Sequence, residues 1–223
     1  MILMPVSSKT SMFGNPFIGI FAKTNDTITL IGVGASDRFV RHIDVLQTEI
    51  VKLPIYGCEL IGIYSVMNNK GVVISSMAEA IELKRDKPGI NMEIMKTKFS
   101  AIGNNVVAND YGALVNPDMS VAEADKIKDI LDVEVVRSGV AGYKTVGAVV
   151  AATNNGFISS PKTTHEELEM MSSLFHVQGG TGTANVGIPF LGISILANKK
   201  GFVVGEQTTG FEFGRINDCL GFV

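Results

Sequence analysis

The side chains best suited to nucleophilic chemistry in this chain are Cys219 and two histidines, His165 and His176. A cysteine attacks as its thiolate, and it needs a nearby base or positive charge to reach that form. The residues around the sulfur, INDCLGFV, are largely apolar, and no histidine motif accompanies them. We therefore expect a buried, unreactive thiol and no catalysis.

Metal and cofactor sites are not indicated either. The histidines lie in separate segments, and the two cysteines, Cys58 and Cys219, form no metal-ligand pattern. The segment GGTGTAN at residues 179–185 resembles a phosphate-binding loop, but Asn185 stands where the dinucleotide fingerprint needs glycine or alanine. We expect no metal and no cofactor, and we predict that residues 179–185 form a flexible loop between structural units.

Composition limits the partners. With 19 basic and 22 acidic residues the net charge is −3, so no overall positive field attracts DNA or other nucleic acids. The apolar runs are far shorter than the roughly 20 residues that span a bilayer, and the N-terminus has no secretory signal pattern. We expect a cytoplasmic protein that does not enter a membrane.

A short phrase recurs five times and sets the architecture. In the copy AIGNNVVANDYGALV, Gly112 follows Gly103 by nine positions, and three other copies keep this pair of glycines. The apolar runs on either side of the polar break predict a strand, a turn and a second strand. The units are 41 to 45 residues long, and their first glycines are Gly19, Gly62, Gly103, Gly147 and Gly192.

A capped helix and a third strand complete each unit. Helix starts are predicted at Ser36 and at four capping boxes, Ser76–Glu79, Ser120–Glu123, Thr164–Glu167 and Thr209–Glu212. Extended segments follow at residues 49–53, 93–98 and 133–136. The last unit lacks a full third strand, and a strand from the N-terminus would complete it. That pairing would close the stack of units into a ring, whereas an open solenoid is the alternative.

Several motifs, in order and at the right spacing, resemble the translation initiation factor 6 family. They are FGNPFIGIFAKTND, AIGNNVVANDYGALVNPD, NNGFISSPKTT and GTANVG. The resemblance covers residues 13–223 and implies an α/β pentein fold, in which five β-β-α-β repeats form a closed ring with pseudo-five-fold symmetry. We accordingly predict a single domain at residues 13–223 and an N-terminal extension at residues 1–12.

The same resemblance implies a function. Members of this family bind the large ribosomal subunit on its intersubunit face, contact a ribosomal protein near the sarcin/ricin loop, and keep the subunit from joining the small one. They also take part in subunit maturation. The resemblance implies neither catalysis nor a cofactor, and we expect a monomer from the archaeal branch.

The resemblance also assigns contact residues. Asn104 follows the first glycine of the third unit, where the other units have Ile20, Ile63, Ala148 and Ile193, and we predict that it is the main ribosome contact, with Asn105 beside it. We also include Ile63 and Val149 among the predicted ribosome contacts, at positions where the family often has a basic and an aromatic residue, respectively.

A second group of predicted contacts is Asn68, Asn69 and Lys70, which lie in the neighbouring turn of the second unit, where the family is often basic at the position of Lys70. These residues also suit a turn that needs asparagine for its own geometry, as do Asn109 and Asp110.

Two other functions remain as alternatives. The pentein fold also hosts guanidino-modifying enzymes with a cysteine nucleophile, which here would be Cys219. The second alternative is a ring-shaped RNA-binding protein, which would contact ribosomal RNA through lysines at the rim such as Lys23, Lys70 or Lys162. Aromatic residues make up only 7% of the chain, so there is little material for stacking on bases.

Overall fold

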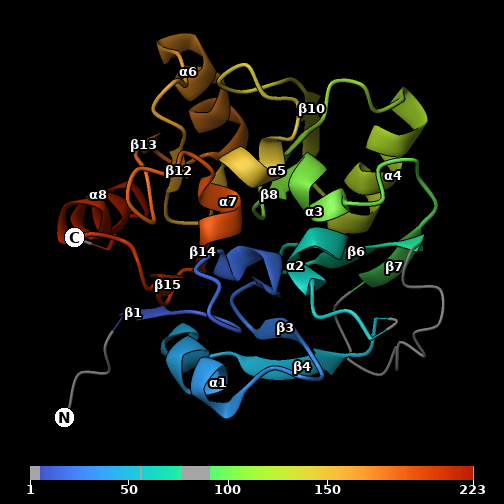
Figure 1. Ribbon diagram of the computed structural model, residues 1–223. Helices are drawn as coiled ribbons and strands as arrows, with labels where there is room; N and C mark the ends of the chain where they lie inside the picture. Colours follow the sequence, from blue (N-terminus) through green and yellow to red (C-terminus); the bar gives the residue numbers. More distant parts are fainter. Residues whose placement is uncertain (1–5, 56, 77–90, 223) are drawn as a thin grey trace.

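The computed structural model describes residues 6–55, 57–76 and 91–222, and it shows an α/β protein built from five small sheets (Figure 1). Each sheet has three strands, of which two form an antiparallel hairpin and the third pairs in parallel with the second hairpin strand. The sheets are β2-β3-β4 (Ala22–Thr24, Ile28–Gly32, Glu49–Leu53), β5-β6-β7 (Ser65–Met67, Gly71–Ser75, Asn91–Met95), β8-β9-β10 (Val106–Ala108, Gly112–Val115, Glu134–Arg137), β11-β12-β13 (Ala151–Ala152, Phe157–Ser159, Gly179–Thr181) and β14-β15-β1 (Ile195–Ala197, Phe202–Gly205, Ser7–Thr10).

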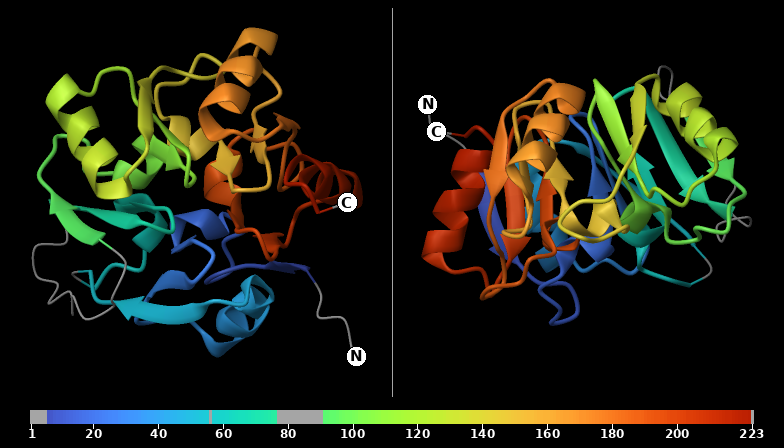
Figure 2. Two further views of the ribbon diagram at one scale, coloured as in Figure 1. Left: turned by 180° about the vertical axis from the view of Figure 1, so that it is seen from behind. Right: turned by 90° about the horizontal axis from the view of Figure 1, so that it is seen from above.

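Longer helices cover the outside of the sheets (Figure 2). They are α1 (Asp37–Ile43, continued by the 3-10 helix η2 at Asp44–Leu46), α4 (Val121–Leu131), α6 (His165–Phe175) and α8 (Gly210–Cys219). Three predicted capping boxes are confirmed, because Ser120 with Glu123, Thr164 with Glu167 and Thr209 with Glu212 make both reciprocal bonds. Ser36 caps α1 as predicted, and the Ser76–Glu79 box extends beyond the described residues.

The start of each unit differs from the prediction. Where we expected the first strand to begin at the first glycine, that glycine lies in a single helical turn that precedes the strand. The turns are η1 (Ile18–Ile20), α2 (Ile61–Tyr64), α3 (Ile102–Asn105), α5 (Val146–Val149) and α7 (Leu191–Ser194). Three or four residues are too few to show a helical period, so the sequence pattern could not separate these turns from the strands that follow them.

Close packing of backbones explains the first glycine. A Cβ added to Gly103 would lie 1.9 Å from the carbonyl oxygen of Gly62, and one added to Gly62 would lie 1.9 Å from that of Gly19. The series continues through the remaining units and returns to its start, since a Cβ on Gly19 would lie 2.5 Å from the Gly192 carbonyl oxygen. Any side chain here would collide with the preceding unit.

The second glycine has a different neighbour. A Cβ on Gly71 would lie 2.0 Å from the carbonyl oxygen of Ile130, and one on Gly112 would lie 2.3 Å from that of Leu174. Both carbonyls belong to the last turn of the outer helix in the next unit. This glycine therefore lets the hairpin turn approach the neighbouring helix.

The hydrophobic core is divided among the junctions between units. One cluster joins Val66 and Val73 of the second unit to Ile127 of α4, and another joins Leu196 and Val203 of the fifth unit to residues of the first. Each of the five clusters combines two neighbouring units in this way. A unit thus buries its apolar side chains only when its neighbours are present.

The chain's first strand completes the last unit, as the sequence predicted. Ser7–Thr10 form β1, which pairs in parallel with β15 with Ser7 opposite Phe202. This strand lies within residues 1–12, which we predicted as an extension, so that range contributes to the sheet. The five described sheets stay separate, each with two edge strands, and they follow one another around a common centre (Figure 1).

One predicted loop is partly a strand. Gly179–Thr181, within the expected flexible loop, form β13 and pair in parallel with Phe157–Ser159. A Cβ on Gly180 would lie 2.9 Å from the Cys219 sulfur, so the glycines allow α8 to pack on this strand. The prediction of a loop was wrong here because close packing, and not flexibility, calls for these glycines.

Candidate functional site

The strand β5 separates the predicted contact residues into two groups. Its first end carries the helical turn with Ile63, and its other end carries the hairpin turn with Asn68 and Asn69. Each unit repeats this arrangement. We call the end of the molecule with Phe17, Ile20, Leu60, Ile63, Asn104, Ala148, Phe190 and Ile193 the single-turn face, and the opposite end, with Asp26, Asn69, Asp110, Asn154 and Lys199, the hairpin face. Asn68, Asn69 and Lys70 therefore lie at the opposite end of the strands from Asn104 and Ile63.

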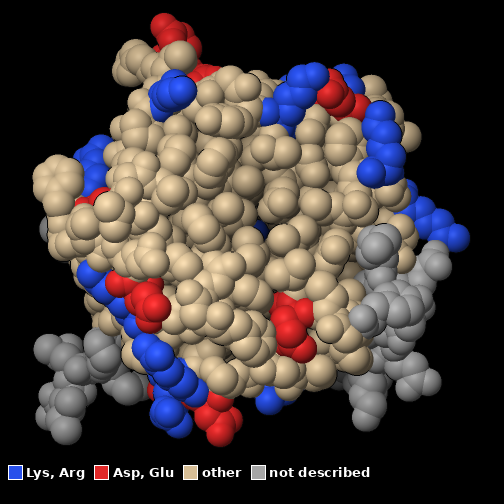
Figure 3. Space-filling view, in the orientation of Figure 1, with Lys and Arg blue, Asp and Glu red and all other residues tan. Residues whose placement is uncertain are grey.

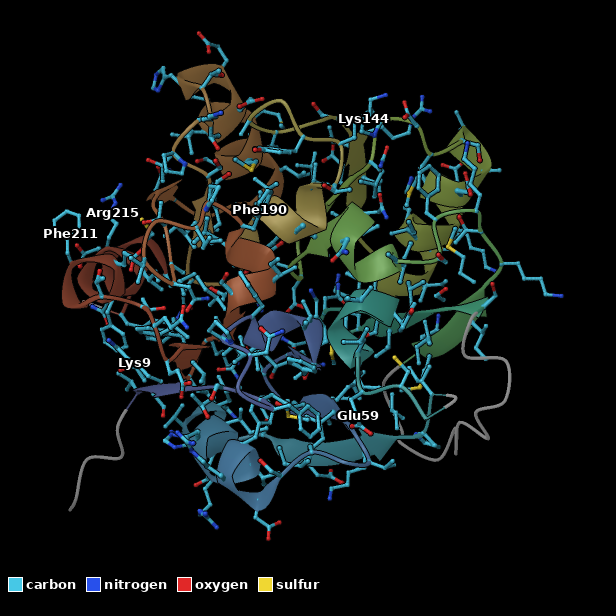
Figure 4. The ribbon with its side chains drawn as sticks, viewed as in Figure 1. Lys9, Glu59, Lys144, Phe190, Phe211 and Arg215 are labelled. Atoms are coloured by element: carbon cyan, nitrogen blue, oxygen red, sulfur yellow. The ribbon has the colours of Figure 1, made fainter. Side chains whose placement is uncertain are left out.

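The single-turn face carries little charge over most of its area (Figure 3). Two charged side chains on it, Glu59 and Lys144, are labelled in Figure 4, and both have partners. The Glu59 carboxylate accepts the Gly34 N–H at 3.0 Å, and the Lys144 ammonium contacts Asp118 at 2.8 Å. Phe17, Leu60 and Phe190 on this face are half-buried and so expose apolar area, which gives the face an apolar character.

Asn104 is the polar side chain among the five residues that directly follow the first glycines. It is half-buried in α3, its backbone N–H bonds the Ala101 carbonyl at 3.0 Å, and its side-chain amide has no hydrogen-bond partner among the described residues. A primary amide offers two donors and an acceptor with two lone pairs. Its hydrogen-bonding capacity is therefore available to a partner.

Asn105 has a framework role. Its side chain donates to the Ala101 carbonyl at 2.8 Å and accepts from Asn116 at 2.7 Å, and only 7% of the residue is exposed. Ser194 makes the equivalent bond to the carbonyl four residues earlier in the fifth unit.

Ile63 and Val149 differ in exposure. Ile63 is half-buried on the single-turn face. Val149 is fully buried in the cluster that also contains Phe157 and Phe175, so its side chain is not presented to a partner in this structure.

Asn68 makes a set of four side-chain hydrogen bonds on the hairpin side that recurs in another unit, and we call this set the asparagine bracket. Its amide nitrogen donates to the carbonyls of Asn109 and Leu131 at 3.1 and 2.8 Å, and its oxygen accepts from two N–H groups of its own turn at 2.9 Å. All of its hydrogen-bonding capacity is used. Asn109 makes the same four kinds of bond, which confirms the structural interpretation of that residue.

A second network closes the hairpin face. The Asn69 and Asn154 amides each donate to the carboxylates of both Asp26 and Asp110, at 2.6 to 3.2 Å. Backbone N–H groups add to this, since Asp26 donates to the Asn69 side chain and Asn69 to the Asp110 carboxylate. The two carboxylates are satisfied within the protein.

Lys70 is also engaged. Its ammonium bonds the Asp132 carbonyl at 2.7 Å and the Asp132 carboxylate at 3.1 Å, at the C-terminal end of α4. A cation is favoured there because the helix dipole leaves negative charge at that end.

A narrow cavity of about 50 Å³ lies at the centre, where the first hairpin strands of all five units meet. The described side chains that line it are mostly aliphatic, and Lys23 is the one titratable residue among them. The prediction that Lys23 lies on the outer rim was therefore wrong. The sequence carried a signal for this, because Val66, Val107, Ala151 and Leu196 occupy the equivalent position in the other units.

The surroundings of Cys219 do not favour the thiolate that a nucleophilic cysteine needs. Cys219 is buried in the cluster beneath α8, and burial raises the pKa of its thiol despite the nearby Arg215. His165 is exposed and contacts Glu169 at 3.2 Å, while His176 stacks on Tyr111. No group of three or more potential metal ligands occurs in the described ranges.

Comparison with known proteins gives a consistent result. The model of the eIF-6 family matches residues 7–219. The proteins named translation initiation factor 6 from Picrophilus torridus, Pyrococcus horikoshii and Methanocaldococcus jannaschii are 37%, 36% and 39% identical to this chain. These matches cover 94 to 95% of the chain and 96 to 98% of the relatives. Among the residues that the structure describes, no helix is long and apolar enough to cross a membrane.

Proposed function

This chain belongs to the eIF-6 family, and on that premise we propose that it binds the intersubunit face of the large ribosomal subunit and blocks premature joining of the small subunit. We further propose that the five units form the closed ring of the pentein fold. The cyclic contacts of the first glycines and the core clusters at every junction support a ring over an open solenoid. In this proposal the protein acts as a cytoplasmic monomer, without catalysis, and is released during subunit maturation.

The observation that carries the proposal is the free amide of Asn104 on a face of low charge. A half-buried apolar surface with an uncommitted amide suits a protein partner, because the apolar area gives affinity and the amide gives register. The hairpin face is a poorer candidate, since its asparagines and aspartates already bond one another. The proposed partner is a ribosomal protein near the sarcin/ricin loop, with added contact to ribosomal RNA.

Charge also fits the partner. The chain carries a net charge of −3, while ribosomal proteins are mostly basic, so attraction should speed association and salt should weaken it. An RNA-only interface is less well supported, because Lys23 lies in the central cavity and Lys70 is held by Asp132.

Sedimentation of archaeal ribosomal subunits in sucrose gradients tests the function. With the protein in excess, we expect it to migrate with the large subunit and the fraction of joined ribosomes to fall. Unchanged joining at saturating protein would refute the proposal.

A single substitution tests the face. Asn104→Arg places a long charged side chain on the apolar surface, and we expect at least about a tenfold loss of large-subunit affinity, the effect of about 1.4 kcal/mol. The matched control is Asn217→Arg on α8, which should bind normally. Asn104→Arg should leave the melting temperature unchanged. If it lowers the melting temperature together with large-subunit affinity, the asparagine is structural and the assignment of the single-turn face as the binding surface loses its support.

A further inference from the structure

The central cavity contains a charge that has no partner among the described residues. The Lys23 side chain makes no hydrogen bond or ion pair there, although Lys144, Lys70 and Lys200 all do. The carboxylates of Asp26 and Asp110, on the hairpin face, are bonded to Asn69 and Asn154, and the ammonium near Asp26 belongs to Lys199.

The cavity walls offer Lys23 little compensation. Apart from Lys23, the described residues that line the cavity contribute valine, alanine, leucine, isoleucine and methionine side chains and the backbone of Gly192, with Thr24 as the one hydroxyl among them. The Thr24 hydroxyl already contacts the Thr29 hydroxyl at 2.8 Å and the Ile28 carbonyl at 3.3 Å. A buried charge in such surroundings is costly unless a counterion or water offsets it.

Burial lowers the pKa of Lys23 from 10.5 to about 8. At neutral pH the amine nevertheless remains mostly protonated, because the pKa is still above 7. Lys23 keeps some exposed area, which is exposure to the cavity that it lines. The positive charge is thus present inside the cavity under ordinary conditions.

We propose that the central cavity binds one small monovalent anion from solution, of the class of chloride, bromide and formate, with the Lys23 ammonium as its partner. Lys23 gives the cavity its positive charge, and no carboxylate among the described lining residues neutralises that charge or attracts a competing cation. The anion enters from the single-turn face, where Figure 3 shows an opening at the centre, since hydrogen bonds close the hairpin face. Large anions such as gluconate should not fit between the closely packed turns.

Bromide offers a direct test, because it scatters anomalously and replaces chloride. We expect crystals of the wild-type protein grown in bromide to show an anomalous peak in the cavity, within about 3 Å of the Lys23 ammonium. Crystals of Lys23→Met, which keeps the length of the side chain without its charge, should show none. Water alone at this place in the wild type, or a peak that persists in Lys23→Met, would overturn the proposal.

Chloride-35 NMR gives the same test in solution. The wild type should broaden the chloride signal beyond what its surface produces, and bromide should reverse the broadening while gluconate should not. Lys23→Met should lose the excess, and Lys162→Met, which removes an exposed lysine, should keep it. Equal broadening by the wild type and Lys23→Met would refute a site at Lys23.

Discussion

The carboxylate of Glu212 is expected to make the stability of this protein depend on pH well below neutrality. One carboxylate oxygen accepts from the Gly187 N–H at 2.7 Å and the Thr183 hydroxyl at 2.8 Å, and the other accepts from Thr209 and from the Val186 N–H at 3.2 Å. The residue is only 6% exposed. Burial alone would raise the pKa of Glu212, but the hydrogen bonds outweigh it and lower the pKa from 4.5 to about 2.

This lowered pKa corresponds to a defined amount of stability. The change from 4.5 to about 2, at about 1.36 kcal/mol per pKa unit, gives about 3 kcal/mol. Because the folded pKa is the lower one, this stability is fully present above pH 4.5 and is lost as the pH falls from about 4.5 towards 2. A neutral side chain at this position removes the dependence.

Urea unfolding from pH 7 to pH 3 measures the effect. Glu212→Gln should be less stable than the wild type at pH 7, and the difference should shrink by about 2 kcal/mol on going to pH 3, since Glu212 is then protonated in the unfolded wild type but still mostly ionised in the folded one. Glu134→Gln, at an exposed glutamate on β10, is the control and should change little at any pH. A wild-type minus Glu212→Gln difference that stays constant down to pH 3 would refute the reasoning.

Two further predictions concern the framework. Gly103→Ala should destabilise the fold by about 3 kcal/mol or more in urea unfolding, because its Cβ would lie 1.9 Å from the Gly62 carbonyl oxygen. The control is Gly214→Ala, where the added Cβ meets open space within α8, and it should stabilise the fold by up to about 1 kcal/mol. Equal effects of the two would contradict the close-packing argument. Asn109→Ala should lower the free energy of unfolding by about 3 kcal/mol or more in the same assay, since it leaves four backbone groups without their partner. A loss of stability as small as that caused by Asn217→Ala would show that the asparagine bracket contributes little.

The repeated architecture was accessible from the sequence because it rests on local signals. The capping boxes at Ser120, Thr164 and Thr209 each reflect one turn of backbone, and all three appear in the structure. The glycine spacing repeats along the chain, so it could be recognised by comparing the units. The single helical turns did not show themselves, because four residues carry no period. The strand at Gly179–Thr181 was missed because its composition is that of a loop.

The candidate site was less accessible for a different reason. Whether Asn68 is a contact or a bracket depends on the carbonyls of Asn109 and Leu131, which lie in another unit. The same holds for Lys23, whose isolation follows from the walls of four other hairpins. Residue types at equivalent positions of the units can be compared from the sequence alone. The partners that a side chain contacts in a neighbouring unit cannot be read from the sequence.

The pairing of β1 with β15 has a consequence for how the chain reaches this structure. Four sheets form from residues within one unit, but Ser7 meets Phe202 only after almost the whole chain is available. Bringing such distant segments together carries a large loop-closure cost and slows folding. During synthesis on the ribosome, β1 therefore remains unpaired until the last hairpin has emerged, and its exposed edge is the point at which a newly made chain is most open to chaperones or to mispairing with another copy.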